Sequence, residues 1–137
     1  MLAMILALTF GLLDPSVLAI PVVHAAEKSW TPELVKELAR DTAQKYKLNT
    51  QKFLHTLNCE NQFKAKGQSE HFYKGKREMS FGAAQINLPS HPTISREQAE
   101  DPDFAIHFMA EEWAKSNAGL WSCWNNYNRD GWPKEKL

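Results

Sequence analysis

The sequence predicts a single, mainly helical domain of the α+β kind, with an irregular loop or a short hairpin in its middle. Apolar residues recur every three or four positions in residues 30–63 and again in residues 101–115, as on one face of an amphipathic helix. Residues 64–80 lose that period and carry glycines and many charges. The length of 137 residues suits one domain with a modest core.

Two helices are predicted in the first periodic stretch. The first begins after Thr31, a good N-cap, and Pro32 suits its first position. The second begins at Asn49 or the residue after it, and Glu60 follows the apolar Leu57 by three positions. That spacing puts Glu60 on or beside the buried face of the second helix. The two apolar faces consist of Leu34, Val35, Leu38, Ala39, Ala43 and Tyr46, and of Phe53, Leu54 and Leu57.

The middle of the chain combines turn residues with one short periodic stretch. Gly75 favours a short hairpin within residues 64–80. The sequence SFGAAQIN, residues 80–87, predicts the start of a short helix with Ser80 near its cap. Pro89 and Pro92 end that helix.

Capping patterns introduce the remaining helices. The sequence SREQ, residues 95–98, fits a capping box. Asp101 followed by Pro102 starts the second periodic stretch, and Gly119 is its natural terminator. The last segment, LWSCWNNYNRD, surrounds Cys123 with aromatic residues.

Residues 1–26 are predicted to be a signal peptide and residues 27–137 the mature domain. The stretch is almost entirely apolar up to Glu27, and Val23 and Ala25 fit the small-residue cleavage pattern. An anchor that is not removed is the alternative, because no Lys or Arg precedes the apolar run. Asp14 and Pro15 interrupt that run, which disfavours a spanning helix. The predicted location is the cell envelope, the periplasm or the extracellular space, with no stable membrane span after cleavage.

Cys59 and Cys123 are the two cysteines, and we expect them to form one disulfide. Neither a CxxC pair nor a His at zinc spacing accompanies them, and small exported domains commonly carry disulfides. A nucleophilic pair of Cys59 with His55 is the alternative, although the sequence displays no third group to orient it. The five His are scattered, so no metal site and no cofactor are predicted.

Composition excludes some classes of function. The net charge of zero does not suggest a nucleic-acid groove, so no nucleic-acid partner is predicted. A hydrophobic content of 43% argues against disorder. The five Trp stand out, because Trp stacks well on flat apolar faces, including those of sugar rings. Glu60 has two interpretations: a partly exposed residue near a helix end, or a general acid whose pKa is raised by apolar surroundings.

The motifs CENQF, SFGAAQINLPSHP, AEDPDFAIHFMAEEWAK and WSCWNNY together resemble those of soluble lytic transglycosylases and their goose-type lysozyme relatives. The resemblance spans residues 54–127 and implies a lysozyme-like fold. It implies that Glu60 is the catalytic acid/base of a bacterial cell-wall enzyme. The residues that it implies for sugar binding are Ser80, Gly82, Gln85, Asn87, Trp124 and Asn125.

The resemblance also implies a reaction. Glu60, as the single general acid/base, would cleave the β-1,4 bond between MurNAc and GlcNAc in peptidoglycan glycan strands and leave 1,6-anhydro ends. The acetamido group of the substrate would support the cation, and the 6-hydroxyl of the same sugar would attack. No metal or diffusible cofactor is required, and the protein is expected to be a monomer.

Two alternatives stay open. A hydrolase of the same bond would use a second carboxylate, for which Glu70 is the candidate in a connection that also holds Glu78. A non-catalytic peptidoglycan-binding module on the same scaffold is suggested by Asn61 and Trp124, which stand where the family has Ser and Tyr.

Overall fold

The structure, a computed structural model, describes residues 29–137. The first helix begins after the predicted N-cap, Thr31, and the second begins at Thr50, one of its two predicted starts. α1 (Pro32–Lys45) follows Thr31, whose Oγ1 accepts a hydrogen bond from the Leu34 N–H. α2 (Thr50–Asn61) follows Asn49, whose Oδ1 accepts from the Lys52 N–H. The predicted signal peptide, residues 1–26, lies outside the described residues.

The later helices also begin at the predicted caps. α3 (Arg96–Ala99) has the full capping box, in which Ser95 and Gln98 bond to each other's backbone N–H groups. α4 (Pro102–Ala114) follows Asp101, whose Oδ1 accepts from the Asp103 N–H. The chain continues through η2 (Ala118–Leu120) into α5 (Ser122–Asp130). No helix within residues 29–137 is long and apolar enough to cross a membrane.

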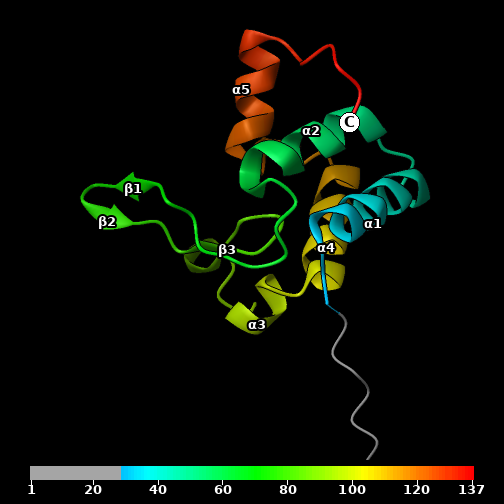
Figure 1. Cartoon of the computed structure of the whole chain (residues 1–137). Coiled ribbons are helices and arrows are strands. Elements are labelled where there is room, and N and C mark those ends of the chain that lie inside the picture. Colours follow the sequence, from blue (N-terminus) through cyan, green and yellow to red (C-terminus); the bar gives the residue numbers. More distant parts are fainter. Residues whose placement is uncertain (1–28) are drawn as a thin grey trace, which may run out of the picture.

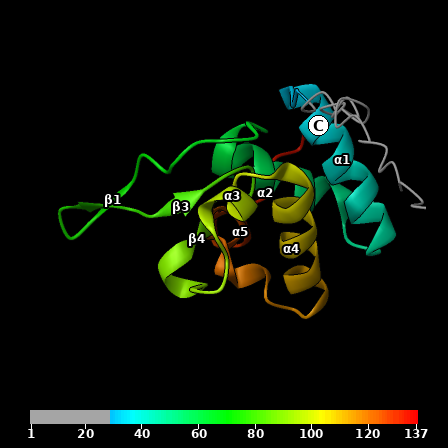
Figure 2. The same cartoon turned by 90° about the horizontal axis from the view of Figure 1, so that it is seen from below.

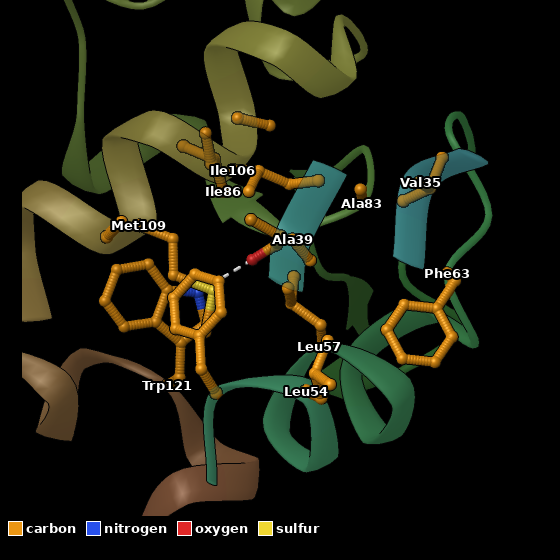
Figure 3. Close-up of a cluster of buried hydrophobic side chains, with 14 of the residues drawn as sticks. Val35, Ala39, Leu54, Leu57, Phe63, Ala83, Ile86, Ile106, Met109 and Trp121 are labelled. Atoms are coloured by element: carbon orange, nitrogen blue, oxygen red, sulfur yellow. Dashed lines mark hydrogen bonds between the residues drawn. The ribbon is translucent and has the colours of Figure 1, made fainter. Parts of the chain in front are cut away.

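The fold is mainly α, as the sequence predicts, and α2 lies between α1 and α5 (Figures 1 and 2). α4 packs on α1 and α3. Figure 3 shows the cluster of buried hydrophobic side chains between these elements, in which Trp121 lies beside Met109. The Trp121 Nε1–H donates to the carbonyl oxygen of Ala84 at 2.7 Å, so this indole is both buried and hydrogen-bonded. Leu54, Leu57, Val35, Ala39 and Ile106 complete the centre of the core.

A short hairpin projects from the helical body, as expected around Gly75 (Figures 1 and 2). β1 (Phe72–Tyr73) and β2 (Lys76–Arg77) pair in antiparallel fashion. The two turn residues between them, Lys74 and Gly75, have φ of 50° and 77°. Two positive φ values in a two-residue loop are typical of the tight turns that match the twist of the flanking strands.

The prediction of a short helix over residues 80–87 is wrong, because these residues form a second antiparallel hairpin. β3 (Ser80–Phe81) pairs with β4 (Ile86–Asn87), and the 3-10 helix η1 (Leu88–Ser90) follows. Gly82 has φ 77° and Gln85 has φ 47°, a left-handed conformation that cannot continue a right-handed helix. A Cβ on Gly82 would lie 1.6 Å from the carbonyl oxygen of Ala99, so the turn packs directly on the backbone of α3.

The prediction that Gly119 terminates the helix of residues 101–115 is also wrong. α4 ends at Ala114, and Ser116 adopts φ 69° directly after the C-cap residue, Lys115. The Ser116 N–H donates to the carbonyl oxygen of Trp113, which satisfies one of the last free carbonyls. A serine therefore takes the left-handed position that glycine usually occupies after a helix, and Gly119 lies within η2.

The predicted disulfide is confirmed. Cys59 at the end of α2 and Cys123 near the start of α5 are joined by an S–S bond of 2.03 Å, with Cα atoms 6.0 Å apart. The alternative of a Cys59–His55 nucleophilic pair is thereby removed, because the sulfur is already bonded. His55 is buried instead, and its Nε2–H donates to the carbonyl oxygen of Glu135 at 2.9 Å.

We predict that Gly82→Ala destabilises the chain far more than Gly75→Ala. Both glycines have φ 77°, so the backbone strain of a new Cβ, about 1–2 kcal/mol, is common to the two variants. Gly75 has no atom within 4 Å of the added Cβ, whereas Gly82 meets the Ala99 carbonyl. We expect a loss of more than about 3 kcal/mol for Gly82→Ala in urea unfolding followed by circular dichroism. Equal losses would contradict the close packing of this turn on α3.

Candidate active site

Glu60 lies in the last turn of α2 and bonds to the start of α5. Its Oε1 accepts a hydrogen bond from the backbone N–H of Cys123 at 3.0 Å, and the Ser122 side chain supplies a second hydrogen bond. α5 has no side-chain cap from its own N-cap residue, Trp121. The carboxylate of Glu60, which belongs to α2, therefore caps the N-terminus of α5. It lies at the positive end of the α5 dipole, which favours negative charge.

The local sequence explains why Glu60 faces α5. Phe53, Leu54 and Leu57 are buried on one face of α2, and Glu60 follows Leu57 by nearly one helical turn. Gln62 ends the helix with φ 53°, so the chain turns away directly beyond this residue. The burial of the apolar face thus fixes the rotation of α2, and that rotation directs Glu60 to the start of α5.

The pKa of Glu60 is raised above its ordinary value of 4.5. Burial is the largest cause, because the ionised carboxyl is poorly solvated, and the negative charge of Glu78 raises the pKa further. The N–H of Cys123 acts in the opposite direction, as do the charge of His71 and the hydrogen bond from Ser122. The net effect is a carboxyl that holds its proton to a higher pH than an ordinary glutamate, which is what a general acid requires.

A cleft of about 180 Å³ opens beside Glu60. Its walls come from the end of α2, the segments on either side of the β1–β2 hairpin, the β3–β4 hairpin, η1, α4, and the chain from the end of η2 into α5. Its lining combines polar side chains with aromatic and aliphatic ones. The polar wall consists of Ser69, His71, Glu78, Ser80, Gln85, Asn87, Ser90 and His91, and the apolar wall of Ile86, Phe108, Leu120 and Trp121.

The second carboxylate in this cleft is Glu78, whereas the candidate from the sequence, Glu70, is exposed and does not line the cleft. Three side chains hold Glu78. The Ser80 hydroxyl donates to Oε1 at 2.9 Å, the Ser69 hydroxyl donates to Oε2 at 3.2 Å, and the Asn87 amide donates to Oε1 at 3.5 Å. A signal for Glu78 was present in the sequence, because residues two apart in an extended chain share a face and Glu78 precedes Ser80 by two.

Three of the predicted sugar-binding residues line the cleft: Ser80, Gln85 and Asn87. Much of their hydrogen-bonding capacity is used within the protein. The Gln85 amide donates to the carbonyl oxygens of Gly82 at 2.8 Å and Gly67 at 3.3 Å. The side-chain Oδ1 of Asn87 accepts hydrogen bonds from the backbone N–H and the hydroxyl of Ser90. These residues build the wall of the cleft as well as lining it.

The other three predicted sugar-binding residues do not line the cleft. Gly82 is buried against α3, as described above. Trp124 packs edge-on against Trp113 with ring centroids 6.4 Å apart, and the Asn125 amide donates to the carbonyl oxygen of Gly119 at 2.8 Å. Trp121, one of the five Trp whose rings could stack on a sugar, lines the cleft in their place.

Asn61 links α2 to the turn of the second hairpin. Its Nδ2 group lies within hydrogen-bonding distance of three carbonyl oxygens, those of Gly82 at 2.9 Å, Lys64 at 3.1 Å and Lys66 at 3.3 Å. An amide at this position therefore holds the hairpin that carries Ser80 and Asn87 against the end of α2. A serine hydroxyl has one donor and a shorter reach, and could not make the same set of contacts.

A larger hollow of about 960 Å³ lies between the start of α1, residues 64–66, and the region where α3 meets α4. Of its four carboxylates, Asp101 caps α4, Glu100 pairs with Arg96 at 3.3 Å, and Asp103 is exposed. Hydrogen bonds to its own backbone N–H and to Ser95 lower the pKa of Glu97. A lowered pKa is the opposite of what a general acid needs, so the cleft at Glu60 is the candidate active site.

Within residues 29–137, no three His, Cys, Asp or Glu side chains gather in a way that could hold a metal ion. Comparisons of the chain with protein-family models, curated proteins and solved structures gave no match. The candidate site is therefore defined by its own geometry.

We predict that Glu60→Gln stabilises the folded chain at neutral pH and that this gain shrinks in acid. Because folding raises the pKa of Glu60, the wild-type chain has its full stability from this group only below pH 4.5 and loses it as the pH rises through the folded-state pKa. A glutamine keeps the acceptor for the Cys123 N–H and has no charge to bury. Urea unfolding at pH ~4 and pH ~7 measures the difference.

Glu70→Gln is the matched control for this experiment, because it removes an exposed carboxylate that does not line the cleft. If both variants showed the same change between the two pH values, burial of Glu60 would not be the cause.

Proposed function

We propose that this protein is an exported lytic transglycosylase that cleaves peptidoglycan glycan strands, with Glu60 as the single general acid/base. The observation that carries the proposal is the state of Glu60: a carboxyl with a raised pKa, in a cleft, with one oxygen fixed by the N–H of Cys123. The disulfide fits an oxidising compartment, and the monomeric state and envelope location are parts of the same proposal.

Glu60 acts twice in the proposed reaction. Its proton passes to the oxygen of the β-1,4 bond between MurNAc and GlcNAc as that bond breaks, and the acetamido group of the substrate supports the positive charge that develops. The carboxylate then accepts the proton of the 6-hydroxyl of the same sugar, whose oxygen bonds to the anomeric carbon. The product has a 1,6-anhydro end, and Glu60 has regained its proton.

The start of α5 supports this cycle electrostatically. After Glu60 gives up its proton, the negative charge lies against the N–H of Cys123 and the positive end of the α5 dipole. These groups are already oriented when the charge forms, so they need not reorganise during the reaction. Burial favours the protonated form of Glu60, which donates the proton. The N-terminus of α5 stabilises the carboxylate that remains after donation and so limits its free-energy cost.

Hydrolysis of the same bond is the second candidate, and Glu78 is the observation in its favour. A hydrolase needs a second carboxylate to activate water or to stabilise the cation, and Glu78 lines the same cleft in an orientation set by Ser69, Ser80 and Asn87. Under this reading a water molecule attacks the anomeric carbon in place of the 6-hydroxyl.

We predict that Glu60→Gln abolishes glycan cleavage and leaves the binding of the protein to peptidoglycan intact. Gln cannot donate a proton to the leaving oxygen, and a lost general acid costs roughly 10²–10⁴-fold in rate. Digestion of purified peptidoglycan followed by mass spectrometry measures both turnover and product, and anhydro products are lighter than hydrolytic ones by one water. Unchanged turnover in Glu60→Gln would remove Glu60 from the mechanism, and Glu70→Gln controls for the loss of a carboxylate outside the cleft.

We predict that Glu78→Gln retains most of the turnover and shifts the alkaline limb of the pH–rate profile to lower pH. The variant removes a negative charge that raises the pKa of Glu60, so the acid loses its proton at a lower pH than before. The profile of initial rates from low to high pH on solubilised glycan is the measurement. A loss of turnover of more than about 100-fold would instead identify Glu78 as an essential second carboxylate and favour the hydrolase.

A further inference from the structure

The tip of the β1–β2 hairpin presents two aromatic side chains to solvent. Phe72 is 70% exposed and Tyr73 is 71% exposed, more than any other large apolar side chain in residues 29–137. The hairpin extends away from the helices in both views of the molecule (Figures 1 and 2). Adjacent exposed rings of this size on a projecting element are a feature of surfaces that bind a partner.

Positive charge concentrates in the same part of the chain. Residues 64–77 hold five basic residues and one acidic residue, Glu70, although the whole chain has no net charge. At the tip itself, Lys74 and Lys76 are exposed, and no ion pair within residues 29–137 involves either of them. The Lys74 ammonium lies 5.2 Å from the centroid of the Tyr73 ring, so positive charge and an aromatic ring lie side by side at the tip. We call Phe72, Tyr73, Lys74 and Lys76 the tip patch.

Hydrogen bonds across the base of the β1–β2 hairpin fix the backbone that carries the tip patch. The Arg77 guanidinium donates to the carbonyl oxygens of Ser69 at 2.8 Å and Gln68 at 3.3 Å, across the base of the hairpin. The N–H of Glu78 donates to the carbonyl oxygen of His71 at 2.8 Å. Arg77 is therefore part of the hairpin's own structure, and Lys74 and Lys76 are the cations that remain for a partner.

We propose that this hairpin tip docks on the surface of a lipid bilayer that carries anionic headgroups. Phe72 and Tyr73 enter the interfacial layer, where aromatic rings are favoured, and Lys74 and Lys76 contact the headgroup phosphates. The tip residues do not line the cleft at Glu60, so a glycan strand keeps its access to the cleft when the tip is docked. This inference goes beyond the proposed function and does not depend on it.

The charges favour a bilayer over a second glycan-binding surface. A neutral sugar ring gains from the aromatic rings and little from two lysines, and the carboxylates of peptidoglycan lie on its peptide stems and not on the rings. An anionic bilayer presents an apolar layer and a dense layer of phosphates together. Each Lys near such a surface strengthens binding by about fivefold, and the attraction falls off within a Debye length. Binding by the tip is therefore expected to require anionic lipid and to weaken with salt.

The test is co-sedimentation of the full chain with vesicles of phosphatidylcholine alone and with vesicles that contain roughly a quarter phosphatidylglycerol. The ratio of the two partition coefficients isolates the contribution of charge, because any apolar contribution of residues 1–26 is common to all variants. Lys74→Ala/Lys76→Ala is expected to lower binding to the anionic vesicles by about 25-fold. Phe72→Ala/Tyr73→Ala is expected to lower binding to both kinds of vesicle, and both variants should still cleave solubilised glycan.

The matched control is Lys134→Ala/Lys136→Ala, which removes the same charge from exposed positions near the other end of the described chain. Equal losses in the control and the hairpin variant would overturn the proposal, since net charge alone would then explain binding. Equal binding of the wild type to neutral and anionic vesicles would also overturn it. So would hairpin variants that lose sedimentation with purified peptidoglycan and keep vesicle binding, because the partner would then be the wall.

Discussion

Three consecutive residues at the end of α2 hold α5 and the second hairpin in place, and the candidate site depends on all three. Cys59 is bonded to Cys123 in α5, Glu60 accepts a hydrogen bond from the N–H of Cys123, and Asn61 donates to the carbonyl oxygen of Gly82. The end of one helix thus holds both the start of α5 and the second hairpin. Because the disulfide keeps α5 in place, Glu60 can gain or lose its proton without α5 detaching from α2.

Burial of Glu60 lowers the stability of the folded chain at neutral pH and also gives the carboxyl the raised pKa that the proposed chemistry needs. Burial of Glu60 makes its ionised form unfavourable, and the same burial raises its pKa, which is the direction that the proposed general acid requires. Glu78, which lines the same cleft, adds to the effect, and it is itself held by the hydroxyls of Ser69 and Ser80 and the amide of Asn87. The hairpins therefore shape the electrostatics of Glu60 as well as the wall of the cleft, while the tip of the first projects away from it.

Much of the fold could be predicted because its signals are local. Thr31, Ser95 and Asp101 cap helices as predicted, since capping depends on a side chain and the backbone N–H groups two or three residues away. The helix expected over residues 80–87 failed for the opposite reason. Its conformation is set by the left-handed turn at Gly82 and by contact with the Ala99 backbone, which is distant in sequence.

The sequence alone determined the mainly helical class, the caps, the disulfide and the position of Glu60 beside a buried helix face, because periodicity and spacing express these features directly. The tertiary structure alone decided which groups surround Glu60. It brought Glu78 and Trp121 to the cleft and left Glu70, Trp124 and Asn125 outside its lining. The physical reason is that a cleft forms where separate elements pack, so its lining depends on how those elements pack and not on neighbours in the chain.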